Sequence, residues 1–286
     1  MMEIKSVFFT MGLVFLVIGL LAGCTSNPVG KDKIGAGNRK ISGRVQLDEE
    51  NHPDKVYVWL EGFEQGVFTN ENGQFSLTLP SGVKGEVTGV FKLYFFVANY
   101  KLDFVEVVLR NGEFVFDEAG LNAEGELRQP KRMQKFLSTT TEVEPSSVRF
   151  NDNGGIRVNV ELQTVASGAD TVTVVFPNTS AGFLGPIFVQ NVESEAVFIF
   201  ESLPVTTREV VLVGVAPVTR SASFSISSLN LPPARYRVIP FMHIMHEEIP
   251  PGLLESIGSN LKELTPNYLM IPWDRDGGDF EVTPAQ

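Results

Sequence analysis

The feature that most limits the fold of this chain is a series of short segments in which apolar and polar residues alternate. The series begins at Lys40, where Ile41, Gly43 and Val45 alternate with polar neighbours. Alternate side chains of a β-strand point to opposite faces, so a period of two predicts strands with one buried face. Similar runs recur, separated by turn residues, as far as Ile244. The sequence therefore predicts an all-β fold.

The first group of runs occupies the part of the chain before residue 117. Asn72-Gly73 predicts a tight reversal inside it, because both residue types tolerate positive φ. We expect strands at 56–60, 66–69, 75–79, 92–97 and 104–109.

Residues 40–80 resemble the carboxypeptidase regulatory-like domain, a small β-sandwich of transthyretin type. The family's Gly-x-Val and Val-x-Val strands are matched by Gly43, Val45, Val56 and Val58, and its threonine, turn and Gly-x-Phe by Thr69, Gly73 and Phe75. His52-Pro53-Asp54 replaces the family's usual loop. The resemblance implies an accessory module without catalytic residues.

A polar segment, 117–147, predicts a linker or a long ornamented loop, and a second group of runs follows it. Their regular spacing favours a second β-sandwich, Ig-like in type. We expect strands at 156–162, 172–176, 183–189, 196–200, 209–215, 222–226, 236–244, 268–271 and 279–282. One short helix near the C-terminus is expected over 253–264, because apolar residues fall at helical spacing between Pro251 and Pro266.

The first residues have the organisation of an export signal. Lys5 supplies a positive charge, and an uncharged, mostly apolar run over 7–23 follows it. The run is short for a membrane-spanning helix, which needs about 20 apolar residues. We therefore expect a signal peptide over 1–23, a flexible tether over 24–38, a first sandwich over 39–116, the linker over 117–147, and a second sandwich over 148–286.

Leu21-Ala22-Gly23-Cys24 resembles the lipobox of bacterial lipoproteins. The resemblance implies cleavage before Cys24 and acylation of that cysteine, typically including palmitate. Cys24 is the only cysteine of the 286 residues, so no internal disulfide competes for it. Two or more acyl chains anchor a protein stably. The expected location is the bacterial cell envelope, and Thr25 after the cysteine favours the outer over the inner membrane of a Gram-negative cell.

The net charge of −11 argues against nucleic acid as a partner. No Gly-x-Ser-x-Gly or phosphate-binding glycine loop is present in the sequence. Aromatic residues offer either strand packing or a sugar-binding face, and the sequence leaves both open. They are Tyr57, Trp59, Tyr94, Tyr100, Tyr268 and Trp273.

Two groups of residues have the chemistry of metal ligands. His243 and His246, followed by Glu247 and Glu248, would suit a metal-dependent hydrolase if the segment were helical, but on a strand the two histidines point to opposite faces. Asp274, Asp276 and Asp279 with Gly277 and Gly278 form a loop that would suit one Ca²⁺ ion, or a solvated turn. No other cofactor is expected.

These observations favour a non-enzymatic, lipid-anchored envelope protein. We expect it to display its sandwiches to a surface protein or a carbohydrate. The alternatives are a metal-dependent hydrolase using His243, His246 and Glu247, and a purely structural envelope lipoprotein.

Overall fold

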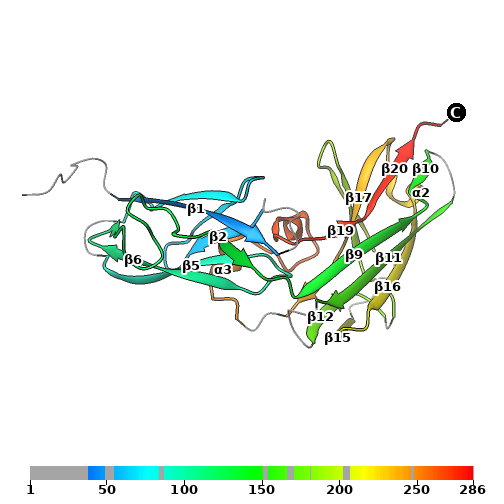
Figure 1. The fold of residues 1–286 in the computed structure, drawn as a ribbon. Coiled ribbons are helices and arrows are strands. Elements are labelled where there is room, and N and C mark those ends of the chain that lie inside the picture. Colours follow the sequence, from blue (N-terminus) through cyan, green and yellow to red (C-terminus); the bar gives the residue numbers. More distant parts are fainter. Residues whose placement is uncertain are drawn as a thin grey trace, which may run out of the picture. The chain divides into compact units, whose positions relative to one another are not determined.

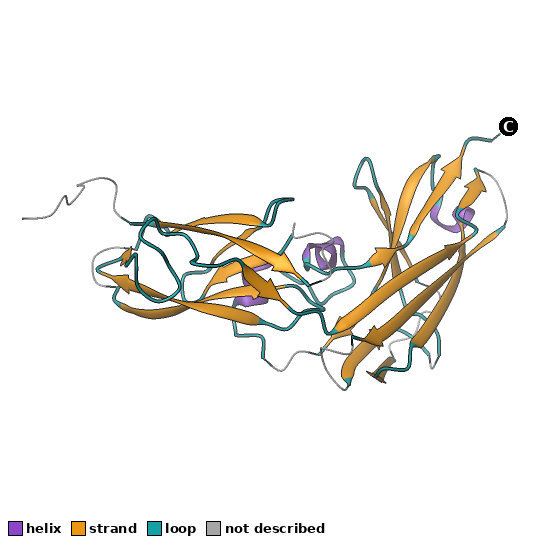
Figure 2. Cartoon of the chain, in the orientation of Figure 1, coloured by secondary structure: helices purple, strands orange, loops and turns teal. Residues whose placement is uncertain are grey.

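The computed structural model describes residues 38–48, 55–83, 87–150, 154–165, 171–180, 182–201, 207–245 and 248–285. Among these residues strands are the main regular secondary structure, joined by turns and loops, with two short α-helices and one 3₁₀ helix (Figures 1 and 2). The expected all-β class is confirmed. Cys24, His52, His246 and Glu247 lie outside the described residues, as do the expected signal peptide and almost all of the expected tether.

The first sandwich consists of a three-stranded and a five-stranded sheet. The orders are β4-β1-β8 and β3-β2-β5-β6-β7. The strands are β1 (Lys40–Leu47), β2 (Tyr57–Leu60), β3 (Gln65–Phe68), β4 (Gln74–Thr78), β5 (Gly89–Phe96), β6 (Asp103–Arg110), β7 (Glu113–Phe114) and β8 (Lys131–Met133).

The alternation in β1 and β4 works as the sequence predicts. Ile41, Val45, Phe75 and Leu77 are buried in the core between the two sheets. Gly43 is required for packing, because a Cβ at that position would lie 2.7 Å from Cγ of Leu127.

The reversal between β3 and β4 is confirmed, and side chains fix it. The Asn70 carboxamide oxygen accepts hydrogen bonds from the backbone N–H groups of Asn72 and Gln74, and Gly73 takes a φ of 72°. The Thr69 hydroxyl accepts a hydrogen bond from the Val56 N–H at 3.0 Å. These residues therefore serve a strand reversal.

The second sandwich surrounds its own core and has three sheets. Their orders are β10-β20-β17-β13-β14, β16-β11-β9-β19 and β15-β12-β18. The strands are β9 (Leu137–Glu144), β10 (Ser147–Arg149), β11 (Gly155–Thr164), β12 (Val172–Pro177), β13 (Ile187–Asn191), β14 (Val197–Phe200), β15 (Arg208–Val213), β16 (Val218–Ser225), β17 (Ala234–Pro240), β18 (His243–Ile244), β19 (Asp276–Gly277) and β20 (Asp279–Thr283).

The segment 117–147 is not the linker or long loop that its polar composition predicts, because it contributes strands to both sandwiches. β8 pairs in parallel with β1, and β9 pairs along its length with β11. Leu121, Leu127 and Met133 are buried in the first core. Its large apolar residues are few, but all of them are buried, so a count of apolar residues underestimates the order of this segment.

The C-terminal region differs from expectation in its helices. α3 (Leu253–Ile257) ends at Gly258, well before Pro266, and Leu261 is buried without being helical. The expected strand 268–271 belongs to a 3₁₀ helix, η1 (Pro266–Met270), because Pro266 begins a turn here. An unexpected helix, α2 (Ile226–Leu229), follows β16, where the Ser225 hydroxyl caps its first turn.

Candidate functional site

The outer face of β2 and β5 is buried. Tyr57, Trp59, Tyr94 and Phe96 point away from the first core, yet none is more than 7% exposed. They join a third apolar core, which we call the junction core. It also contains Phe188, Ile239, Phe241, Leu253, Ile257, Leu261, Tyr268 and Ile271.

Tyr268 lies at the centre of the junction core. Its ring stacks on Phe188 at 5.3 Å, and its hydroxyl donates a hydrogen bond to the Met242 carbonyl at 2.7 Å. Tyr100 is also buried, and Trp273 is partly buried. The expected alternative of a sugar-binding aromatic face is therefore wrong for these residues, since such a face needs exposed rings.

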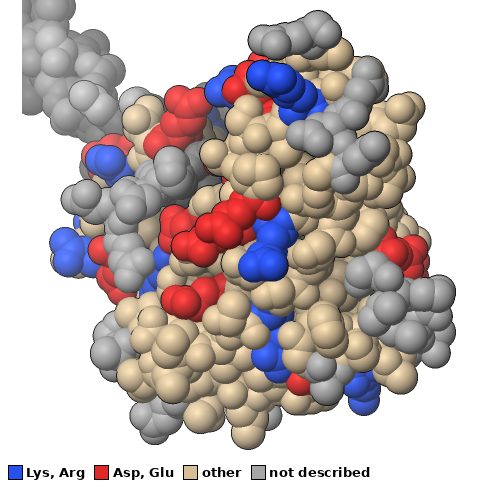
Figure 3. All heavy atoms as spheres, turned by 90° about the vertical axis from the view of Figure 1, so that its right-hand side faces the viewer, with Lys and Arg blue, Asp and Glu red and all other residues tan. Residues whose placement is uncertain are grey.

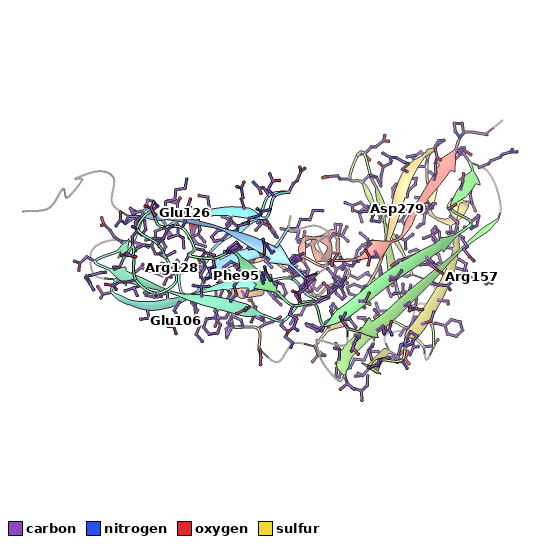
Figure 4. All side chains as sticks on the ribbon, viewed as in Figure 1. Phe95, Glu106, Glu126, Arg128, Arg157 and Asp279 are labelled. Atoms are coloured by element: carbon purple, nitrogen blue, oxygen red, sulfur yellow. The ribbon has the colours of Figure 1, made fainter. Side chains whose placement is uncertain are left out.

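The three aspartates of the expected Ca²⁺ loop have different partners. Asp274 accepts a hydrogen bond from Tyr100 and pairs with Lys135, whereas Asp279 pairs with Arg237 at 2.9 Å. Asp276 lies exposed in β19, and Asp279 is labelled on β20 in Figure 4. Among the described residues, no three His, Cys, Asp or Glu side chains gather as metal ligands. The structure therefore does not assemble the expected site.

The strongest candidate for a binding site is a cavity of about 380 Å³ beside β18. Most of its lining is apolar, from Phe96, Val175, Met242, Ile249, Leu254 and Trp273. Arg208, Glu255 and Lys262 contribute charged side chains to the lining and are themselves exposed. An apolar cavity with a few polar groups is typical of a binding site.

A sheet surface adjoins this cavity. Val175 of β12 lies opposite both Val210 of β15 and His243 of β18, and directly opposed residues share a face. Leu212 lies opposite Thr173, two residues from Val175, and therefore on the same face. Met245 is two residues beyond His243. We call Val175, Val210, Leu212, His243 and Met245 the β12 face.

The β12 face is apolar and exposed at its outer members. Val210, Leu212 and Met245 are 56%, 68% and 59% exposed, respectively. β15 is also the outermost strand of its sheet. Exposed apolar side chains beside an apolar cavity make this face a candidate interaction surface.

His243 lies where the β12 face meets the cavity. Burial is the main cause that lowers the pKa of its imidazole, and the positive charge of Lys262 lowers this pKa further. A hydrogen bond with the Lys262 backbone acts in the opposite direction and raises the pKa, but its effect is smaller. The ring packs against Phe241 at 5.0 Å. His243 is therefore a neutral, packed side chain in the folded protein near pH 7.

Charge is otherwise mixed over the described surface. On the face shown in Figure 3, acidic and basic side chains lie next to one another, and broad areas carry neither. No helix among the described residues has the length and hydropathy to cross a membrane.

Sequence reasoning missed the β12 face, although one signal was present. In β15 both alternating sets are apolar, Val211 and Val213 toward the core and Val210 and Leu212 toward solvent. A strand with two apolar faces outside a doubly covered sheet indicates a second contact surface.

No protein-family model matches the chain, and no curated protein matches its sequence. Among solved structures, it is similar to BcpA, the major pilin subunit of Bacillus cereus, at 10% identity and a TM-score of 0.28, over 73% of this chain and 64% of BcpA. The TIE protein of Bacillus anthracis is similar at 8% identity and a TM-score of 0.23, over 71% of this chain and 45% of the TIE chain. CBD12 from CALX1.2 is similar at 9% identity and a TM-score of 0.20, over 86% of this chain and 100% of the CBD12 chain. This chain thus spans less than two thirds of BcpA, and at such TM-scores the likenesses carry no argument about function.

Proposed function

We propose that this chain is a non-enzymatic lipoprotein of the bacterial cell envelope that binds another surface protein through its β12 face. The exposed apolar face formed by Val210, Leu212 and Met245 beside the cavity carries the proposal. The leader and Cys24 support the anchor. The first sandwich is proposed to be a carboxypeptidase regulatory-like module.

The occupant that best fits the site is an extended segment of a partner protein with an apolar side chain flanked by acidic residues. The apolar side chain would enter the cavity, and Arg208 and Lys262 would attract the acidic groups. Because β15 is an outermost strand, the partner's backbone can pair along it.

Other occupants fit less well. A carbohydrate face needs exposed aromatic rings, and the exposed members of the β12 face, Val210, Leu212 and Met245, are not aromatic. A second copy of the chain would bring together two molecules that each carry a net charge of −11. Repulsion between like charges opposes that association.

The binding proposal is tested by site-specific photocrosslinking in the native envelope. A photoreactive residue at position 212 should give one dominant protease-sensitive adduct. The matched control is position 90, because Val90 is 61% exposed on β5 of the first sandwich. Equal adducts at both positions, or none at either, would contradict the proposal. An adduct at 212 that resists protease but not glycosidase would favour the carbohydrate alternative.

The anchor is tested separately. Cys24→Ala should abolish incorporation of labelled palmitate and move the protein from the membrane fraction to the soluble fraction. A variant that keeps both would refute the lipid anchor while leaving the β12 face untouched.

The two alternatives predict different outcomes. A metal-dependent hydrolase using His243, His246 and Glu247 predicts stoichiometric zinc in the purified full chain, and zinc would overturn the non-enzymatic proposal. A purely structural envelope lipoprotein predicts the absence of any adduct from position 212.

A further inference from the structure

Three segments that are distant in the sequence meet around a buried lysine. Lys135, between β8 and β9, is 3% exposed, and its backbone bridges to that of Tyr100 after β5. Asn99 is completely buried. Its side-chain amide donates to the Asp274 carbonyl at 2.8 Å, and its oxygen accepts from the Asp274 N–H at 3.0 Å. Asn99 therefore fixes the backbone from which the Asp274 carboxylate projects.

The Asp274 carboxylate meets two groups at one oxygen. Lys135 Nζ lies 3.1 Å from Oδ2, and the Tyr100 hydroxyl donates a hydrogen bond to the same Oδ2 at 2.9 Å. The two paired side chains are only 4% and 12% exposed. Burial disfavours the charged forms of both groups. Transfer of a proton from the lysine to the carboxylate, which makes both groups neutral, is therefore easier here than in water.

We propose that Lys135 and Asp274 join in an intramolecular amide bond. A proton passes from Nζ to Oδ2, which leaves a neutral amine beside a carboxylic acid. The amine nitrogen attacks the Asp274 carboxyl carbon, and a second proton moves from Nζ to the departing oxygen. The bond between nitrogen and carbon forms, the bond from carbon to Oδ2 breaks, and one water leaves. No oxidant or other reagent is consumed.

The surroundings favour this condensation. Fixed neighbours hold the nucleophile against its target, which removes the entropic cost of bringing two groups together. Tyr100 donates to the oxygen that departs, so its hydrogen bond stabilises the charge that develops there. The low exposure of both side chains limits the access of water for the reverse reaction.

The bond would connect the two ends of the second sandwich. Lys135 stands just before β9, and Asp274 stands just before β19, which pairs in parallel with β9. The bond would close a covalent loop from residue 135 to residue 274, which contains the strands from β9 to β18.

Peptide mass spectrometry of the full chain tests the proposal. After complete denaturation and trypsin digestion, Lys135 should resist cleavage. Peptide 133–149 should be joined to peptide 263–275, with a mass lower than their sum by one water. Separate peptides 136–149 and 263–275 from the wild-type chain, without the branched product, would overturn the proposal.

Two variants separate a covalent bond from an ion pair. Lys135→Arg keeps the positive charge near Asp274 but provides no amine nucleophile, so the branched peptide should be absent. Tyr100→Phe should slow the appearance of the branched peptide in freshly synthesised protein by at least tenfold. A branched product that persists in Lys135→Arg would assign the link to other residues and also overturn the proposal.

Discussion

Two outer sheet faces of this protein carry apolar residues alike but have different surroundings. In β2, Tyr57 and Trp59 face away from the first core, and in β15, Val210 and Leu212 face away from the second. The first pair is buried in the junction core, at 3% and 2% exposure, whereas the second pair is 56% and 68% exposed. Apolar residues on the second face of a strand thus do not by themselves show whether the chain covers that face, and only the fold decides it.

The largest expected loss of stability comes from disrupting the junction core, which covers the outer face of β2 and β5. Tyr268→Ala removes a fully buried ring and its hydrogen bond, and should lower the free energy of unfolding by about 3 to 5 kcal/mol. Urea denaturation measures it. Met270→Ala in the same 3₁₀ helix is the control, since Met270 is 44% exposed. Equal losses in both variants would mean that the junction core does not hold the face closed.

A smaller effect is expected from one polar contact at the edge of that face. The Tyr57 hydroxyl donates to Ser256 and lies 3.0 Å from both its carbonyl oxygen and its hydroxyl. Tyr57→Phe should cost about 1 kcal/mol in the free energy of unfolding. Ser256→Ala should cost less, because the carbonyl acceptor remains. The reverse order would place the main stabilisation in the serine hydroxyl.

His243 gives a pH-dependent test on the exposed side of the comparison. Its pKa is lowered in the folded protein, mainly by burial. The unfolded chain therefore takes up the proton first, and stability should fall as pH drops below about 6.5. The loss is complete once pH has passed below the folded pKa. NMR titration of the ring protons locates that pKa, and His243→Gln should flatten this part of the stability curve. A folded pKa above the ordinary value would contradict the sign.

The smallest effect on stability is expected on the exposed face itself. Leu212→Ser should change the free energy of unfolding by no more than about 0.5 kcal/mol, because the side chain is already in water. Val213→Ser, one residue along, should cost more than about 2 kcal/mol, because Val213 is fully buried. Partner crosslinking from a photoreactive residue placed next to position 212 should fall in Leu212→Ser and should not fall in Val213→Ser. A large loss of stability in Leu212→Ser would show that the chain itself covers this face.

The sequence predicts most strands because local residues decide them. Ile41 and Val45 alternate with polar neighbours, and Asn70 and Gly73 supply the turn chemistry within a few residues. The errors arise where distant residues decide. η1 forms at 266–270 because Pro266 begins a turn and Tyr268 inserts between Phe188 and Phe241, which no local pattern contains.

The candidate site was less predictable than the fold. Asp274 and Asp279 are close in the sequence, but they form ion pairs with different residues. Asp274 pairs with Lys135, and Asp279 pairs with Arg237. Val175, Val210 and His243 are distant in the sequence and meet only through strand pairing. A prediction from one chain can identify ligand-like residues, but the pairing register decides which of them share a surface.

The junction core has a consequence for the time at which the protein can fold. The aromatic face of β2 and β5 is synthesised before the segment that covers it, from α3 to Ile271, which follows much later in the chain. Phe280 and Val282 of the second core come later still. A chain that emerges N-terminus first must therefore carry Trp59 and Tyr94 without their complete cover until α3 and Tyr268 have been made. Until then these rings are exposed apolar surface, which favours misassembly of a partly synthesised chain.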